Sequence, residues 1–307
     1  MFANLAVSGG AHLCIPFLGF LRAIAPILSG VKRVSGCSAG ALVAVAWVLD
    51  MPPRIVISLL VTMMERGLFS DVSVPLLWCR FGLVDAELAV GATAKKMIDA
   101  GVTRWKTIKN GCPPDASDNN GNITMQELAK LTGTSLAVGV CDVGRGFAET
   151  FITAETHPNV PVWRALAASC AIPFAFTPVS IGGSLFCDAC ARNGDPMGGI
   201  PAGSGLLDTL LLEVDIFGAR SEASSDNAVP ATLQAYGKSF IKMLLERVSA
   251  SRQQVSTRAQ TAKIPRWTDE VSLPMVSGIS AARLCEAYDH GVKHGKEFLE
   301  NVNKDIR

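Results

Sequence analysis

The pentapeptide Gly36–Gly40 (Gly-Cys-Ser-Ala-Gly) constrains this chain more than any other segment, because it has the pattern Gly-x-Ser-x-Gly. In this pattern the serine lies on a sharp turn between a strand and a helix, and its small neighbours allow the backbone to turn beneath an exposed hydroxyl. The flanking sequence provides that context, since a strand is predicted over Val31–Ser35 and Ala39–Leu49 is helical in pattern. The motif therefore predicts a strand, a turn and a helix around Ser38, with the positive end of the helix dipole near the hydroxyl.

Strands and helices alternate along the rest of the chain. Asn4–Ser8 is typical of a buried strand and Ile15–Leu28 of an apolar helix, and helices are also predicted over residues 87–100 and about 280–302. Such alternation favours a largely parallel sheet covered by helices. We expect an α/β fold, a three-layer α/β/α arrangement with a mostly parallel central sheet.

Composition excludes some classes of protein and of cellular location. The net charge of +1 gives no basic footprint for nucleic acid, so no nucleic-acid partner is expected. No cationic stretch precedes the first apolar run, and no apolar run reaches the roughly 20 residues of a membrane-spanning helix, so neither a signal peptide nor a transmembrane segment is expected. The nine cysteines, an odd number, favour free thiols. We expect an intracellular protein, cytoplasmic or peripheral on membranes.

Three segments resemble metal sites without completing one. Cys187 and Cys190 form a Cys-x-x-Cys pair that lacks a second pair at zinc spacing. Residues 116–127 nearly fit a calcium loop, but Ala116 holds its first position, and Thr124–Glu127 matches a helix capping box instead. His290 and His294 share a helix face without an evident third ligand. We therefore expect neither a metal nor a cofactor.

A serine on such a turn is a candidate for acyl transfer, which needs a nucleophile, a base and donors for the developing oxyanion. Ser38 supplies the first. One βα unit earlier, the loop formed by Gly9, Gly10 and Ala11 can supply backbone N–H groups, because glycine brings no Cβ between the backbone and a reacting carbonyl.

The base is less certain from the residues themselves. Asp188 follows a strand-like segment and could act directly on Ser38. Alternatively, the order serine, acid, histidine would allow a triad that ends at His290 or His294. Both arrangements remain open on the residues alone.

Four segments in order resemble the patatin-like phospholipase family. Ser8–Ala11 is similar to its oxyanion segment, and Gly36–Gly40 to its nucleophile elbow. Ala167–Phe174 resembles its Ala-Ser-x-Ala-Ile-Pro segment. Asp188 lies where the family has its catalytic aspartate, with Asn193 and Pro196 following at matching positions. Together these segments span residues 4 to about 200.

The resemblance implies lipid acyl hydrolysis by a Ser-Asp dyad and an acyl-enzyme. Ser38 would be the nucleophile, Asp188 the general base, and the amides of Gly9, Gly10 and Ala11 the oxyanion hole. The chain departs from the family pattern at Ala11, where a third glycine is usual, and after Asp188, where Ala-Cys replaces Gly-Gly.

The resemblance also suggests partners and a domain division. A phospholipid or another acyl lipid would be drawn from a transiently contacted membrane or lipid-droplet surface. Candidate contacts are Ile55–Met64, Phe69–Phe81 and the basic amphipathic stretch Lys238–Arg258. We expect residues 1–215 to form a patatin-like α/β catalytic domain and 216–307 a helical part of the same globule.

Two other functions stay open. One is an esterase of the α/β-hydrolase class with a Ser-Asp-His triad. The other is a non-catalytic lipid-binding homologue of the patatins.

Overall fold

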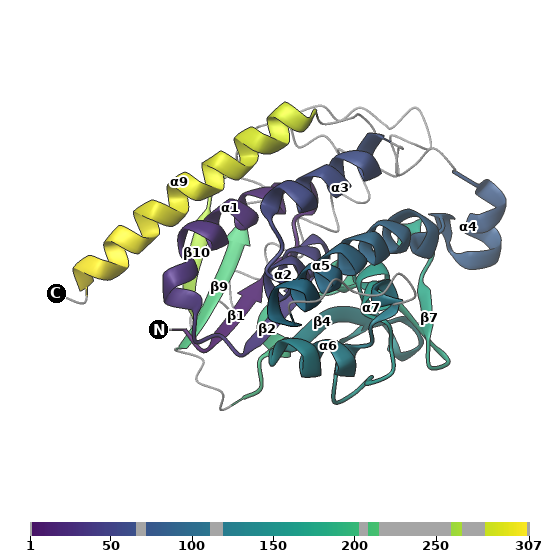
Figure 1. Cartoon of the computed structure of the whole chain (residues 1–307). Helices are drawn as coiled ribbons and strands as arrows, with labels where there is room; N and C mark the ends of the chain where they lie inside the picture. The colour runs from purple at the N-terminus through teal and green to yellow at the C-terminus, as the bar shows by residue number, and fades with distance from the viewer. Residues whose placement is uncertain are drawn as a thin grey trace.

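The computed structural model of the chain describes residues 2–65, 72–110, 119–202, 208–214, 259–265 and 280–305. A mixed sheet forms its centre (Figure 1). In spatial order its strands are β10 (Gln260–Ile264), β9 (Thr209–Val214), β1 (Asn4–Val7), β2 (Arg33–Cys37), β4 (Ser135–Asp142), β8 (Ser184–Asp188) and β7 (Val179–Ile181), and β5 (Ala148–Thr153) also pairs with β4.

Most of the sheet is parallel. The strands from β10 through β9, β1 and β2 to β4 all pair in parallel, whereas β5, β8 and β7 join antiparallel. The parallel strands are buried apolar segments, of which β1 is buried at every residue. Such continuous burial is typical of parallel strands covered on both faces.

One edge of β4 is shared by two strands. Gly139 on β4 pairs with Cys37 of β2, and the next residue, Val140, pairs with Asp188 of β8. Because β5 pairs with β4 across both of these positions, β2 and β8 must lie together on the opposite edge of β4. The two strands approach that junction from opposite directions and end beside each other.

Helices flank the sheet. They are α1 (Ile15–Ala23), α2 (Ala39–Val48), α3 (Pro53–Glu65), α4 (Val74–Arg80), α5 (Ala92–Asn110), α6 (Met125–Thr132), α7 (Val162–Ser169) and α9 (Ala281–Asp305). Helix α2 contacts β1, β2 and β4, and α5 and α7 pack against α2. The 3-10 segment η7 (Pro196–Gly199) packs against the sheet as well, where it contacts β1, β2, β4 and β5. The predicted α/β fold with a mostly parallel sheet flanked by helices is confirmed.

The structure differs from several of the helix and strand boundaries that the sequence predicts. The helix predicted over 87–100 begins as a π-turn at Glu87–Gly91 and continues as α5 through Gly101 to Asn110. Gly101 does not end it, because this glycine lies within the helix against Leu49 and Met51, where a Cβ would be crowded. The strand β10 and the small sheet formed by β3 (Gly82–Val84) and β6 (Phe174–Phe176) were not predicted from the sequence.

The predicted domain division stays a prediction. Its boundary at residue 215 and the basic stretch Lys238–Arg258 lie outside the described residues. Within the described part, β10 pairs with β9, and α9 packs against α1. No described helix combines the length and the apolar content that crossing a bilayer requires.

Helices α1 and α9 cross in backbone contact (Figure 1). A Cβ on Gly291 of α9 would overlap the carbonyl of Pro16, and one on Gly19 of α1 would overlap the carbonyl of Tyr288. Gly295 meets Phe20 in the same way, with its Cβ position 2.8 Å from the Phe20 carbonyl oxygen. Three glycines therefore let the two helices approach more closely than side chains would permit.

Replacing Gly291 with alanine tests this contact. In an unhindered helix the change would stabilise by about 1 kcal/mol. Here the added methyl must push the helices apart, and we expect the free energy of unfolding to fall by about 1–3 kcal/mol in urea titration. The exposed Lys296→Ala on the same helix should change it by less than about 0.5 kcal/mol. A stabilised Gly291→Ala would contradict the close crossing.

Candidate active site

Ser38 lies on the turn between β2 and α2, as the pentapeptide predicts. Its backbone angles are φ 53° and ψ −134°, a strained conformation for a residue with a side chain. The flanking glycines explain how the turn fits. A Cβ on Gly36 would lie 2.7 Å from the Ala41 Cα, and one on Gly40 would lie 2.7 Å from the Ser8 carbonyl carbon. Both positions need glycine, so that α2 can start directly over the ends of β1 and β2.

Asp188 lies at the end of β8 and meets Ser38 at the shared edge of β4. The Ser38 hydroxyl donates a hydrogen bond of 2.7 Å to Oδ2 of Asp188. The second carboxylate oxygen, Oδ1, accepts the Cys190 amide at 2.8 Å, and the Asp188 amide donates to the Ala171 carbonyl at 2.9 Å. The aspartate is fully buried, whereas Ser38 is partly accessible. The two side chains that the resemblance pairs therefore lie in hydrogen-bonding contact.

Ser169, at the end of α7, connects the turn at Ser38 to strand β4 through two hydrogen bonds. Its hydroxyl accepts the Ser38 amide at 2.8 Å and donates to the Gly139 carbonyl of β4 at 2.6 Å. The residue is fully buried. Ser169 lies inside the Ala167–Phe174 segment, but no role for it was predicted from the sequence. The one feature of the sequence that could have pointed to this role is the presence of a serine within the Ala-Ser-x-Ala-Ile-Pro segment.

The loop after β1 lies against the turn. A Cβ on Gly9 would lie 2.9 Å from the Ser38 Cβ, so only glycine fits there without displacement. Gly10 follows, and Ala11 begins the 3-10 segment η1 (Ala11–Cys14). This right-handed turn suits any L-residue, so the departure from the family pattern at Ala11 needs no left-handed backbone. The amides proposed as oxyanion donors therefore belong to a loop that abuts Ser38.

Three histidines, His12, His290 and His294, have the following surroundings. His12 is buried in η1, and burial lowers its pKa to about 4, so the imidazole is neutral at pH 7. On α9, Nε2 of His290 lies 3.0 Å from the Pro265 carbonyl, and Nδ1 of His294 lies 2.9 Å from the Glu297 carboxylate. The Ser38 hydroxyl contacts Asp188.

The two cysteines of the Cys-x-x-Cys pair are buried thiols. Burial raises the pKa of Cys187 and of Cys190 well above the usual value, and the nearby Asp188 charge adds to both shifts. Buried thiols of this kind are inert. No group of metal-binding side chains occurs within the described ranges.

The near-match to a calcium loop has a different structure where it is described. Thr124 and Glu127 form a reciprocal capping box at the start of α6. The Asn120 side chain accepts a hydrogen bond from Lys106 at 2.6 Å. The predicted turn followed by a capped helix is confirmed.

Ser169→Ala tests the support beneath the turn. It removes the partner of two buried backbone groups, and each unsatisfied group typically costs about 1–3 kcal/mol. We expect a loss of at least about 2 kcal/mol in the free energy of unfolding, measured by urea titration. Ser29→Ala is a suitable control, since that exposed hydroxyl makes only a long bond of 3.4 Å to a backbone carbonyl. Equal stability of the two variants would argue against the role of Ser169.

Comparisons with solved structures give distant similarities. VipD from Legionella pneumophila is 17% identical with a TM-score of 0.45, and the match covers 96% of this chain and 67% of that one. The type III effector ExoU of Pseudomonas aeruginosa is 16% identical with a TM-score of 0.49, over 97% of this chain and 53% of that one. The chain thus spans about half the length of ExoU. No sequence among curated proteins matches it.

A family model gives the assignment. The model of the patatin-like phospholipases matches residues 5–199, from β1 to η7. This stretch contains the loop at Gly9, the strained turn at Ser38 and the aspartate at Asp188. The chain therefore belongs to the patatin-like phospholipases, a family of hydrolases that act on ester bonds.

Proposed function

We propose that the protein is a serine lipid acyl hydrolase that cleaves fatty-acyl esters through Ser38 and Asp188. The observation that carries the proposal is the 2.7 Å hydrogen bond between the Ser38 hydroxyl and the Asp188 carboxylate. The strained backbone of Ser38 and the adjoining N-terminus of α2 support it, because both features accompany serine nucleophiles on strand-to-helix turns.

In the first half of the proposed reaction, the Ser38 oxygen attacks the ester carbonyl while Asp188 accepts the hydroxyl proton. The negative charge that develops on the carbonyl oxygen is met by the amides of Gly9, Gly10 and Ala11 and by the positive end of the α2 dipole. The tetrahedral intermediate collapses, the alcohol leaves with the proton from Asp188, and the acyl group remains on Ser38.

In the second half, water attacks the acyl-enzyme and gives a proton to Asp188. Collapse of the second intermediate releases the fatty acid, and Ser38 regains its proton from Asp188. The amide of Cys190 holds Oδ1 of the carboxylate, so that Oδ2 stays directed at Ser38 in both halves. The original serine proton thus leaves with the alcohol, a proton from water replaces it on Ser38, and Asp188 ends each cycle ionised; the proposed reaction needs neither metal nor cofactor.

A lipid hydrolase must also meet its aggregated substrate, and α4 supports this part of the proposal. This helix has no buried residue, and Trp78 is 80% exposed. Three more large apolar side chains are exposed on neighbouring elements, namely Phe81, Phe174 and Leu185. We call these four residues the α4 surface. Aromatic side chains of this kind favour the interface between lipid and water.

The α4 surface lies near the proposed site in the fold. Phe81 precedes Gly82, which pairs with Phe174 between β3 and β6. Phe174 in turn follows Ala171, whose carbonyl holds the Asp188 amide. In contrast, the predicted contact segment Ile55–Met64 is partly in the core, since Val56 and Ile57 of α3 are buried. We therefore place the membrane or droplet contact at α4.

Substitution of the pair tests the mechanism. Ser38→Ala and Asp188→Asn should each lower ester hydrolysis by at least ~10,000-fold, because the nucleophile and its base act as a unit. Hydrolysis of phospholipid, lysophospholipid and triacylglycerol would be measured with a chelator present. Labelling by a fluorophosphonate probe should disappear in Ser38→Ala.

Two controls separate the alternatives. Ser35→Ala removes another buried hydroxyl from β2, one without a hydrogen-bond partner in the described structure, and should retain activity. His290→Gln and His294→Gln should also stay active, whereas a triad esterase would lose activity in one of them. A wild-type protein that binds vesicles but neither hydrolyses esters nor reacts with the probe would instead be a lipid-binding homologue.

Removing aromatic side chains tests the α4 surface. In Trp78→Ala combined with Phe81→Ala, binding to phospholipid vesicles should fall at least about tenfold, since burying one such side chain contributes about 1.5–3 kcal/mol. Hydrolysis of a short monomeric ester should not change. Ile108→Ala serves as the matched control, because Ile108 is 57% exposed at the far end of α5. Unchanged sedimentation of the double variant with vesicles would refute this contact.

A further inference from the structure

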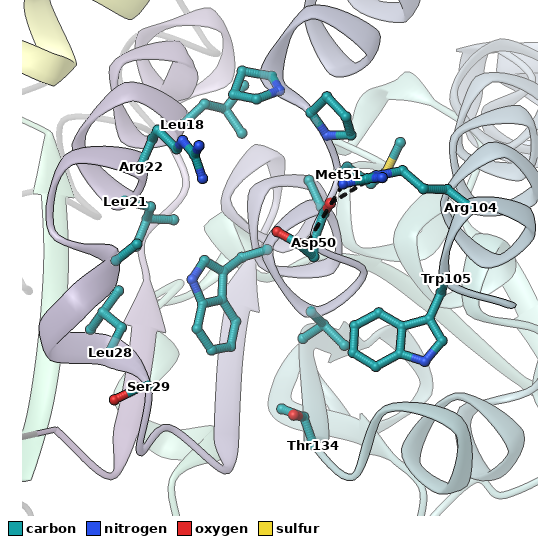
Figure 2. A pocket seen from close by; sticks show the side chains of 16 residues that line it. Leu18, Leu21, Arg22, Leu28, Ser29, Asp50, Met51, Arg104, Trp105 and Thr134 are labelled. Atoms are coloured by element: carbon teal, nitrogen blue, oxygen red, sulfur yellow. Dashed lines mark hydrogen bonds and ion pairs between the residues drawn. The ribbon is translucent and has the colours of Figure 1, made fainter. Parts of the chain in front are cut away.

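Figure 2 shows a cavity of about 460 Å³. It lies by the amino-terminal ends of β2 and β4, whereas Ser38 follows the carboxyl end of β2. Leu28 and Ser29, which precede β2, and Thr134, which precedes β4, contribute to its wall. Helix α2 begins beside Ser38 and reaches the cavity with its last turn, so that about 15 Å of helix separates the two places. The cavity therefore has walls of its own and is distinct from the proposed active site.

Most of the wall is apolar. Helix α1 contributes Leu18 and Leu21, the end of α2 contributes Trp47, and Met51 and Trp105 complete the lining on the side of α5. Cavities that bind small molecules are about 300–1,000 Å³ in size, mostly apolar, and carry a few polar groups at fixed places. This cavity fits that description in both size and lining.

Two guanidinium groups face the cavity from opposite walls. Figure 2 shows Arg22 reaching in from α1 and Arg104 from α5. Arg104 is tied loosely to Asp50, with Nη2 3.7 Å from the carboxylate and Nε 3.4 Å from the backbone oxygen. Arg22 is exposed and forms no ion pair within the described ranges. The three charged groups leave one positive charge in excess beside an apolar wall.

We propose that this cavity binds a single-chain amphiphile with an anionic head group. The alkyl chain lies along the leucine and tryptophan wall, and the head group accepts hydrogen bonds from Arg22, with Arg104 opposite. Guanidinium pairs well with carboxylate and phosphate, and the one acidic group is already engaged by Arg104, so a cationic head group is disfavoured. The proposal goes beyond ester hydrolysis and does not depend on it.

Decanoate below its micelle concentration is a suitable probe. Binding would be followed by calorimetry and by tryptophan fluorescence, since two indoles line the cavity. We expect saturable binding of decanoate, and at least tenfold weaker binding of decyltrimethylammonium, which has the same chain with the opposite charge. Absence of saturable binding, or equal affinity for the two amphiphiles, would overturn the proposal.

Variants locate the site. Arg22→Gln should weaken decanoate binding about tenfold or more, because a charge-assisted hydrogen bond is lost. Arg145→Gln is the matched control: this arginine is 82% exposed on the turn between β4 and β5, and its loss should leave binding unchanged. Ala25→Phe, at an exposed position of the cavity wall, should fill the space and abolish binding. Decanoate affinity that survives both Arg22→Gln and Ala25→Phe would place the ligand elsewhere and refute the assignment.

Discussion

The change of partner along one edge of β4 is the constraint on which the site depends. At Gly139 this edge pairs with β2, and one residue later, at Val140, it pairs with the antiparallel β8. The hydrogen-bond ladder thus brings together the end of β2 and the end of β8, and with them two side chains 150 positions apart in the chain. A slip of one residue in the register between β8 and β4 would turn the aspartate to the other face of the sheet.

Backbone groups hold the reacting atoms in place around that junction. Ser169 connects the Ser38 amide to the Gly139 carbonyl, so the turn is tied to the strand that sets its position. The Cys190 amide fixes one carboxylate oxygen and thereby orients the other. Since an amide does this, a cysteine can occupy a position where relatives have glycine. The Ser169 hydroxyl thus holds the strained turn and the Cys190 amide holds the carboxylate, while His12 in the adjoining loop is kept neutral by burial.

The sequence predicted what is local and missed what depends on distant pairing. The turn at Ser38 was predictable because strand, small residues and helix adjoin in the chain. Asp188 could be assigned only through the family resemblance, because a carboxylate after a strand has many possible roles and its antiparallel approach to β4 leaves no local pattern. The strands β3, β6 and β10 were missed since segments of three to five residues carry little periodicity. The cavity beside Arg22 joins residues from α1, α2 and α5, and no sequence window contains it.

The crossing of α1 and α9 has a consequence for how the protein folds. On one of its two edges, strand β1 pairs with β9, which follows it by about 200 residues. Helix α1 is covered by α9, which begins more than 250 residues after α1. Both contacts close very long loops, and proteins dominated by such contacts fold slowly. A growing chain therefore carries an unpaired edge of β1 until β9 emerges from the ribosome, and an uncovered apolar helix α1 until α9 does. During that interval the exposed strand edge and apolar helix make the chain prone to aggregation.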